Sequence, residues 1–329
     1  MKTFIRCAAK LTAVLVLLII AGPFLLVASD WPEPEFAAAG GTLRFHRTDL
    51  GQASAEIETW TAPDGSELSL RRYPTENPTA PLMVMIHGSG MHSGQFEHLA
   101  TALAAEGVAD VLVPALRGHG PSPERRGDVD YVGQLEDDLA ALIDAEAGAD
   151  QEIILLGHSS GGGLVVRFAG GPHGAMLDRA ILLAPYLGHD APTTRPNAGG
   201  WAHPLLRRYI GLEILNGFGV TALNGLQVVQ FNQPEAVRAD PSAGPMTDAY
   251  TYRLNTSYHP RPDLGADISR LPETLLIAGA DDEAFMADLY QPTMESFTSL
   301  GTYHVLPGLQ HMNVVDATQT AKLVADWLR

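Results

Sequence analysis

Short apolar runs alternate with segments of helical periodicity along most of this 329-residue chain. The runs are three to five residues long and rich in Val, Ile, Leu, Met and Ala: 82–86, 111–113, 153–156, 180–184 and 274–278. Such runs are typical of strands buried on both faces, as in a parallel sheet covered by helices. The order of strands and helices therefore predicts an α/β fold with a mostly parallel, doubly wound sheet.

The alternation is interrupted between residues 186 and 270. This stretch is rich in Pro and Gly near its start and helical in pattern from Pro204 to Phe231, a segment that could pack on the core or line an apolar pocket. Before it, residues 55–73 read as a hairpin of two strands. After it, the pattern predicts a strand at 274–278, a helix near 284–299, a strand at 301–306 and a last helix near 313–328. We expect a core of residues 30–185 and 271–329, into which residues 186–270 are inserted.

The N-terminus carries a targeting segment at residues 1–29. Lys2, Arg6 and Lys10 precede an uncharged run over 11–28, which as a helix would be about 27 Å long, near the roughly 30 Å of a hydrocarbon core. The run reads as a signal anchor, which makes the membrane a partner through an N-terminal helix, or as a signal peptide cleaved near Ser29. Because bases precede it and acids follow, the body is expected outside the cytoplasm, membrane-anchored, or secreted or periplasmic after cleavage.

Charge and cysteine content exclude several classes of function. The net charge is −17, and −20 for residues 30–329, so nucleic acid is not expected as a partner. The only cysteine is Cys7, which leaves the body without a thiolate nucleophile or a cysteine-ligated zinc. His87, His92 and His98 lack the spacing of a helical ligand pair and an accompanying carboxylate cluster, so we expect no metal and no cofactor.

The segment GHSSG at residues 157–161 directly follows the run at 153–156 and precedes a helical segment. At a tight strand-to-helix turn the central residue adopts strained backbone angles, and glycines two positions away on either side avoid clashes. The pattern therefore predicts Ser159 as a nucleophile.

A serine hydroxyl needs a base to take its proton, and the base needs a third group to orient it. His311 and Asp282 each follow a strand run near the end of the chain, in the order expected after such a serine. We predict His311 as the base and Asp282 as the acid. Asp281 and Glu283 remain alternatives to Asp282, and His304, inside a strand run, is the alternative histidine.

The tetrahedral intermediate of acyl transfer needs backbone N–H donors for its oxyanion. One is expected from Ser160, the residue after the nucleophile, and the other from Ser89 in the loop that follows the run at 82–86. Met91 and Met312 flank these loops and are candidate substrate contacts, with core packing as the alternative.

These motifs resemble those of α/β-hydrolases of the monoacylglycerol lipase and lysophospholipase type, which are often grouped with serine aminopeptidases. The resemblance rests on HGSGMHSG at 87–94, RGHG at 117–120, GHSSGG at 157–162 and the loops of Asp282 and His311, and it covers about residues 55–185 and 270–329. The insertion matches the cap, or lid, only in position. Ser160 stands where this group more often has Met, and Ala115 where Asp commonly precedes LRGHG.

The resemblance implies an α/β-hydrolase fold and a serine hydrolase that needs no cofactor. Its expected substrate is a small-molecule or lipid-like carboxylic ester, cleaved through an acyl-enzyme. The N-terminal membrane segment and the apolar insertion favour a lipid-like ester, such as a monoacylglycerol or lysophospholipid. Two alternatives stay open. One is a serine aminopeptidase, in which Glu213, Glu235 or Asp240 would bind the free amine; the other is a binding protein without catalysis.

Overall fold

The computed structural model describes residues 18–33, 43–44, 55–196, 200–233 and 246–329. Eight strands form one sheet in the order β1-β2-β4-β3-β5-β6-β10-β11. They are β1 (Glu58–Thr61), β2 (Glu67–Tyr73), β3 (Leu82–Ile86), β4 (Asp110–Pro114), β5 (Ile153–His158), β6 (Arg179–Leu183), β10 (Glu273–Gly279) and β11 (Gly301–Leu306). The β1–β2 and β2–β4 pairs are antiparallel, and all pairs from β4 to β11 are parallel. The predicted mostly parallel α/β sheet is confirmed.

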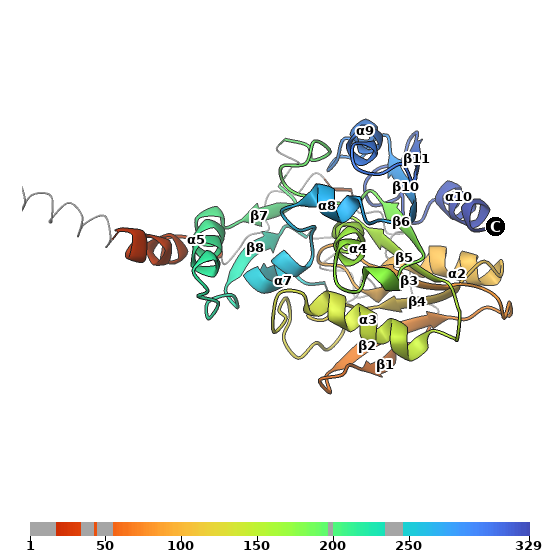
Figure 1. Ribbon diagram of the computed structural model, residues 1–329, viewed down its shortest axis with the longest axis horizontal. Helices are drawn as coiled ribbons and strands as arrows, with labels where there is room; N and C mark the ends of the chain where they lie inside the picture. The colour runs from red at the N-terminus through yellow and green to blue at the C-terminus, as the bar shows by residue number, and fades with distance from the viewer. Residues whose placement is uncertain (1–17, 34–42, 45–54, 197–199, 234–245) are drawn as a thin grey trace, which may run out of the picture.

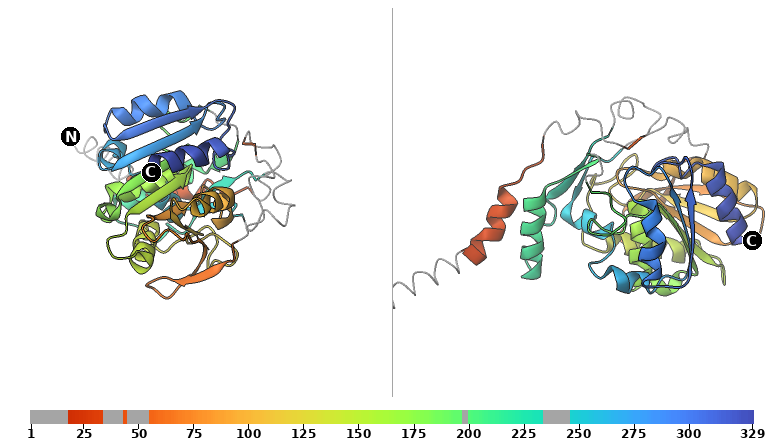
Figure 2. Two further views of the ribbon diagram at one scale, coloured as in Figure 1. Left: turned by 90° about the vertical axis from the view of Figure 1, so that its right-hand side faces the viewer. Right: turned by 90° about the horizontal axis from the view of Figure 1, so that it is seen from above.

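Helices cover both faces of this sheet (Figures 1 and 2). Helices α2 (Glu97–Ala105) and α10 (Thr318–Leu328) pack together on one face. On the other face, α4 (Ser160–Gly170) contacts both α3 (Gln134–Glu146) and α8 (Leu264–Ile268). Short helices complete this part of the chain: η2 (Ser93–Phe96), η3 (Gly174–Met176), η5 (Ala287–Leu289) and α9 (Tyr290–Glu295).

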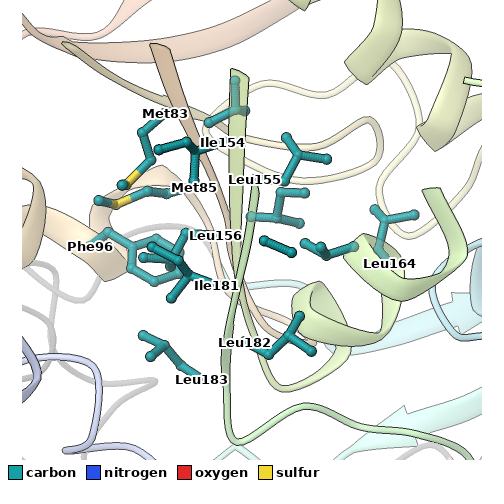
Figure 3. Close-up of a cluster of buried hydrophobic side chains, with 14 of the residues drawn as sticks. Met83, Met85, Phe96, Ile154, Leu155, Leu156, Leu164, Ile181, Leu182 and Leu183 are labelled. Atoms are coloured by element: carbon teal, nitrogen blue, oxygen red, sulfur yellow. The ribbon is translucent and has the colours of Figure 1, made fainter. Parts of the chain in front are cut away.

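The core lies between the central strands and these two helical layers. Phe96 packs with Met83 and Met85 on one side of the sheet, and Leu164 of α4 lies on the other side with Leu155 (Figure 3). All five side chains are fully buried. Burial on both faces explains why β3 and β5 are continuously apolar rather than alternating.

A second, three-stranded antiparallel sheet is formed by residues from the 186–270 stretch, in the order β7-β8-β9. Its strands are β7 (Ala202–Pro204), β8 (Gln227–Phe231) and β9 (Ala249–Thr251), accompanied by α5 (Leu206–Gly217) and α7 (Tyr252–Ser257). In Figure 1, β7 and β8 lie between α5 and the large sheet. The domain boundaries at 185 and 270 stay predictions.

A helix over residues 18–28 lies beside α5 (Figures 1 and 2). Val27 is buried against Leu212 and Leu215 in a small apolar cluster separate from the main core. Residues 11–17 of the apolar run lie outside the described residues. Among the residues that are described, no helix has both the length and the apolar character needed to cross a membrane.

Several local predictions are confirmed and others are wrong. The hairpin at 55–73 and the strand at 301–306 are present as β1–β2 and β11. The helical reading of 204–231 is wrong beyond Gly217, because its end forms strand β8 between β7 and β9. The helix predicted near 284–299 is reduced to η5 and α9, and the last helix begins at Thr318 rather than near 313.

Candidate active site

Ser159 lies at a sharp turn between β5 and α4, with φ of 53° and ψ of −120°. A positive φ is strained for a residue with a side chain. The turn also brings backbones so close that a Cβ at Gly161 would lie 2.1 Å from the carbonyl oxygen of Ile86, and one at Gly157 would lie 2.3 Å from that of Gly161. Only glycine fits at both positions, which accounts for the spacing of the motif.

Three predicted side chains come together at this turn, each from a loop after a parallel strand. His311 Nε2 is 3.1 Å from Ser159 Oγ, and His311 Nδ1 is 2.9 Å from Asp282 Oδ2. His311 and Asp282 are buried. The result is an unbroken line of hydrogen-bonding groups from hydroxyl to imidazole to carboxylate.

Asp282 is held as a carboxylate by its own loop. Its Oδ1 accepts hydrogen bonds from the N–H groups of Ala284 and Phe285, each at 2.8 Å. Burial alone would raise the pKa of Asp282, but the charge and hydrogen bond of His311 and these two N–H donors lower it below the usual value. Because the carboxylate only accepts, His311 Nδ1 carries the proton, which leaves Nε2 free to accept the proton of Ser159.

The alternative residues lie elsewhere. Glu283 accepts from the backbone N–H of His311 at 3.1 Å rather than from the imidazole, and Asp281 is exposed. His304 lies within strand β11. The geometry therefore favours Asp282 and His311 over the neighbours that sequence alone left open.

The two predicted oxyanion donors are adjacent. Ser160 is the first residue of α4, so its backbone N–H lies at the helix start, where N–H groups have no partner within the helix. Ser89 follows β3, and its Oγ is 2.5 Å from Ser160 Oγ. This contact brings the loop after β3 against the start of α4, beside Ser159; the roles of the two N–H groups stay predictions.

A tyrosine from the second sheet supports the loop of Ser89. Tyr250 Oη accepts the N–H of Gly90 at 2.6 Å and lies 2.7 Å from His119 Nε2. Burial lowers the pKa of His119 to about 4, and its Nδ1 contacts the carbonyl of Arg117, so its neutral Nε2 accepts from Tyr250. Sequence reasoning missed Tyr250, since nothing in the local pattern marks a tyrosine that meets a loop 160 residues earlier.

A second hydrogen-bonded line joins the Ser89 loop to the loop of His311. Gln95 Oε1 accepts the N–H of Gly88 at 2.8 Å, and Gln95 Nε2 is 2.9 Å from His158 Nδ1. His158 Nε2 donates to the carbonyl of His311 at 2.9 Å. Burial, and to a smaller extent the neighbouring His311, lowers the pKa of His158 to about 3, which keeps it neutral. His158 thus has a structural, hydrogen-bonded position, and sequence reasoning missed both its link and Gln95.

The other candidate residues are less directly placed. Met91 and Met312 are buried, and their substrate contacts stay predictions. Glu213, a candidate amine ligand, accepts a hydrogen bond from Tyr252 Oη at 2.8 Å, while Glu235 and Asp240 lie outside the described residues. Within the described ranges, no group of three or more His, Cys, Asp or Glu side chains is arranged to hold a metal ion.

Comparison with known proteins identifies relatives of this chain. The family model described as "Serine aminopeptidase, S33" matches residues 77–318. A monoacylglycerol lipase of Mycolicibacterium smegmatis is 33% identical over 159 residues, covering 46% of this chain and 47% of the relative. Phospholipase YtpA of Bacillus subtilis is 28% identical over 113 residues, covering 34% and 43%. The aligned regions thus span less than half the length of these curated relatives.

Solved structures agree on the fold. The monoacylglycerol lipase of Paleococcus ferrophilus superimposes with a TM-score of 0.60 at 19% identity, covering 80% of this chain and 98% of that protein. Likeness at this level of identity establishes the α/β-hydrolase architecture and leaves substrate choice to the site itself.

Proposed function

Because the chain belongs to the serine aminopeptidase S33 family of α/β-hydrolases, we propose that it is a serine hydrolase that cleaves carboxylic esters through an acyl-enzyme. The observation that carries this proposal is the continuous line from Ser159 Oγ through His311 to Asp282, with contacts of 3.1 and 2.9 Å. A serine so placed has the base and the orienting acid that nucleophilic attack requires.

In the proposed mechanism, Ser159 Oγ attacks the ester carbonyl while its proton passes to His311 Nε2. Asp282 stabilises the imidazolium that forms, and the N–H groups of Ser89 and Ser160 bind the oxyanion. Collapse of the intermediate breaks the bond to the leaving alcohol, which takes the proton from His311. Water then attacks the acyl carbon as it gives a proton to His311. The bond from the acyl carbon to Ser159 Oγ breaks, Oγ takes the proton back from His311, and the acid leaves.

The proposed substrate is a lipid-like ester such as a monoacylglycerol or lysophospholipid, with residues 186–270 as the cap. Support comes from the relatives that are named monoacylglycerol lipase and phospholipase. Turnover of p-nitrophenyl acetate, butyrate, octanoate and decanoate by the wild type and Ser159→Ala tests this. We expect Ser159-dependent turnover of the long esters; fast acetate turnover without decanoate turnover would contradict a lipid-like substrate.

The family description favours aminopeptidase activity as the second candidate. An aminopeptidase needs an anionic group for the free α-amine, and Glu213 already accepts a hydrogen bond from Tyr252. Aminoacyl anilides therefore serve as the competing substrates: their turnover at rates above those of the esters would replace the esterase proposal. A binding protein without catalysis would show no difference between the wild type and Ser159→Ala on any substrate.

We also propose that the N-terminal segment targets the body to the outer side of a membrane. The support is the sequence order of three bases, an uncharged run and then acids. Protease treatment of cells whose outer envelope is opened while the cytoplasmic membrane stays intact tests this, because a body outside the cytoplasm is digested and one inside is protected.

A further inference from the structure

Helix α5 exposes a line of apolar side chains. Leu206, Ile210, Ile214 and the C-cap residue Phe218 follow one another at intervals of four residues, with exposed fractions of 60%, 48%, 38% and 70%. Residues four apart lie on one face of a helix, so these side chains form a single stripe. The opposite side of α5 is buried in the small cluster that contains Leu212. A stripe of large side chains that folding leaves exposed marks an interaction surface.

The helix over residues 18–28 extends this stripe. It exposes five large apolar side chains at 45–64%: Leu18, Ile19, Ile20, Phe24 and Leu25. A groove of about 630 Å³ runs between the two helices and is lined by side chains from both, including Leu25 and Phe218. We call these nine exposed side chains, four from α5 and five from the N-terminal helix, the apolar face.

The two helices are fixed to each other. At Gly211 a Cβ would lie 2.7 Å from the carbonyl oxygen of Pro23 and 2.8 Å from Val27 Cγ2, so the helices cross at contact distance. Beyond the crossing, the Arg207 backbone N–H donates to Asp30 Oδ2 at 2.9 Å, and its guanidinium donates to the carbonyl of Ser29 at 2.9 Å. The two helices therefore hold the exposed side chains of the apolar face in a fixed relative arrangement.

The edge of the apolar face carries an exposed tryptophan. Trp31 is 70% exposed just past the N-terminal helix, and the guanidinium of the buried Arg208 lies 5.0 Å from the centre of its ring. Tryptophan is enriched at membrane–water interfaces. The uncharged run over residues 11–28 ends in this helix, so the apolar face is continuous in sequence with the segment proposed to target the membrane. This continuity favours a lipid bilayer as the surface that the apolar face contacts.

We propose that the apolar face docks on the surface of a lipid bilayer, so that α5 and the N-terminal helix contact lipid together. This deepens the proposed function, since it would bring the body to the source of a lipid-like ester. It differs from anchoring by the N-terminal run alone, because it assigns α5 a direct share of the lipid contact.

Vesicle binding of the full-length chain tests the share of α5. The test variant is Ile210→Ser/Phe218→Ser, and the control is Ile57→Ser/Leu300→Ser, whose apolar side chains are 48% and 53% exposed next to the edge strands β1 and β11. On vesicles of phosphatidylcholine and phosphatidylglycerol, we expect the test variant to bind about tenfold or more weakly, because it loses two side chains that the bilayer buries. The control should bind like the wild type.

Three outcomes would overturn the proposal: wild-type chain that does not bind the vesicles, a test variant that binds as tightly as the wild type, or equal losses in test and control. A wild-type dimer in sedimentation that dissociates in the test variant, with vesicle binding unchanged, would assign the apolar face to a second copy of the chain. Turnover of soluble p-nitrophenyl butyrate should be equal in all three proteins. That readout separates failure of docking from failure of the hydrolase assignment.

A spectroscopic measurement locates the contact without reference to activity. The Trp31→Phe variant keeps Trp60, Trp201 and Trp327 and serves as the reference. Relative to it, Phe218→Trp in the same background should add fluorescence that brominated lipids quench and that shifts to the blue on binding. Emission that stays unquenched while the protein is bound would show that α5 does not touch the bilayer.

Discussion

Gln95 joins the two loops on which the proposed chemistry depends, and its replacement by leucine is a sharp test of that arrangement. The side chain is buried, accepts from Gly88 N–H at 2.8 Å and donates to His158 Nδ1 at 2.9 Å. Leucine has a similar size but neither polar group. Gln95→Leu therefore leaves one buried donor and one buried acceptor without partners.

The expected magnitude follows from these two groups. An unsatisfied buried polar group costs about 1–3 kcal/mol, so the free energy of unfolding should fall by about 2–6 kcal/mol in urea titrations. Gly88 precedes Ser89, and His158 hydrogen-bonds the carbonyl of His311, so both sides of the site lose support. We expect kcat for p-nitrophenyl butyrate to fall by about 10- to 100-fold with little change in KM, because small misplacements act on the transition state.

Gln291→Leu is the matched control. Gln291 is exposed and hydrogen-bonds only Glu295, four residues later on the same short helix. We expect its unfolding free energy to change by less than about 0.5 kcal/mol. If Gln95→Leu changed the unfolding free energy as little as the control does, the hydrogen bonds of Gln95 would contribute nothing to stability. If it lowered stability but kept wild-type kcat, Gln95 would not position the site.

Three further results are expected. Burial holds the pKa of His158 at about 3 and that of His119 at about 4, below the ordinary 6.5, so both histidines take up protons more readily in the unfolded chain than in the folded one. The free energy of unfolding should therefore fall by about 2 kcal/mol per histidine from pH 7 to pH 5. Equal urea midpoints at pH 7 and pH 5 would contradict this. Gly161→Ala places a Cβ 2.1 Å from a backbone oxygen of β3 and should lower the thermal midpoint sharply, whereas Gly217→Ala, with open space around it, should not. Asp282→Asn presents an amide N–H₂ to His311 and reverses its tautomer, so kcat should fall on the order of 10⁴-fold; a loss under tenfold would remove Asp282 from the proposed mechanism.

The parts of the fold that the sequence predicts well are those fixed by local chemistry. Strand β5 can be predicted because a strand buried on both faces must be apolar throughout. The turn at Ser159 can be predicted because only glycine fits at positions 157 and 161. The end of the 204–231 segment was misread for the opposite reason. Strand β8 is defined by pairing with β7 and β9, and a short apolar run alone does not distinguish strand from helix.

The residues that support the site also cannot be predicted from the local sequence pattern. Gln95 and Tyr250 act through partners 63 and 131 or more residues away, and nothing in their own segments distinguishes them from surface polar residues. The contact of Gly211 with the N-terminal helix is also long-range, because its partners Pro23 and Val27 lie near the start of the chain. Such long-range contacts become visible only when the chain is folded.

The most direct measurement of the central claim is covalent labelling of the wild-type chain by a fluorophosphonate, followed by mass spectrometry of the intact protein and its peptides. Because His311 and Asp282 activate the hydroxyl of Ser159, we expect a single adduct on Ser159. It should be absent in Ser159→Ala and form far more slowly in His311→Ala. An adduct on a different residue, or none on folded wild-type protein, would contradict the account.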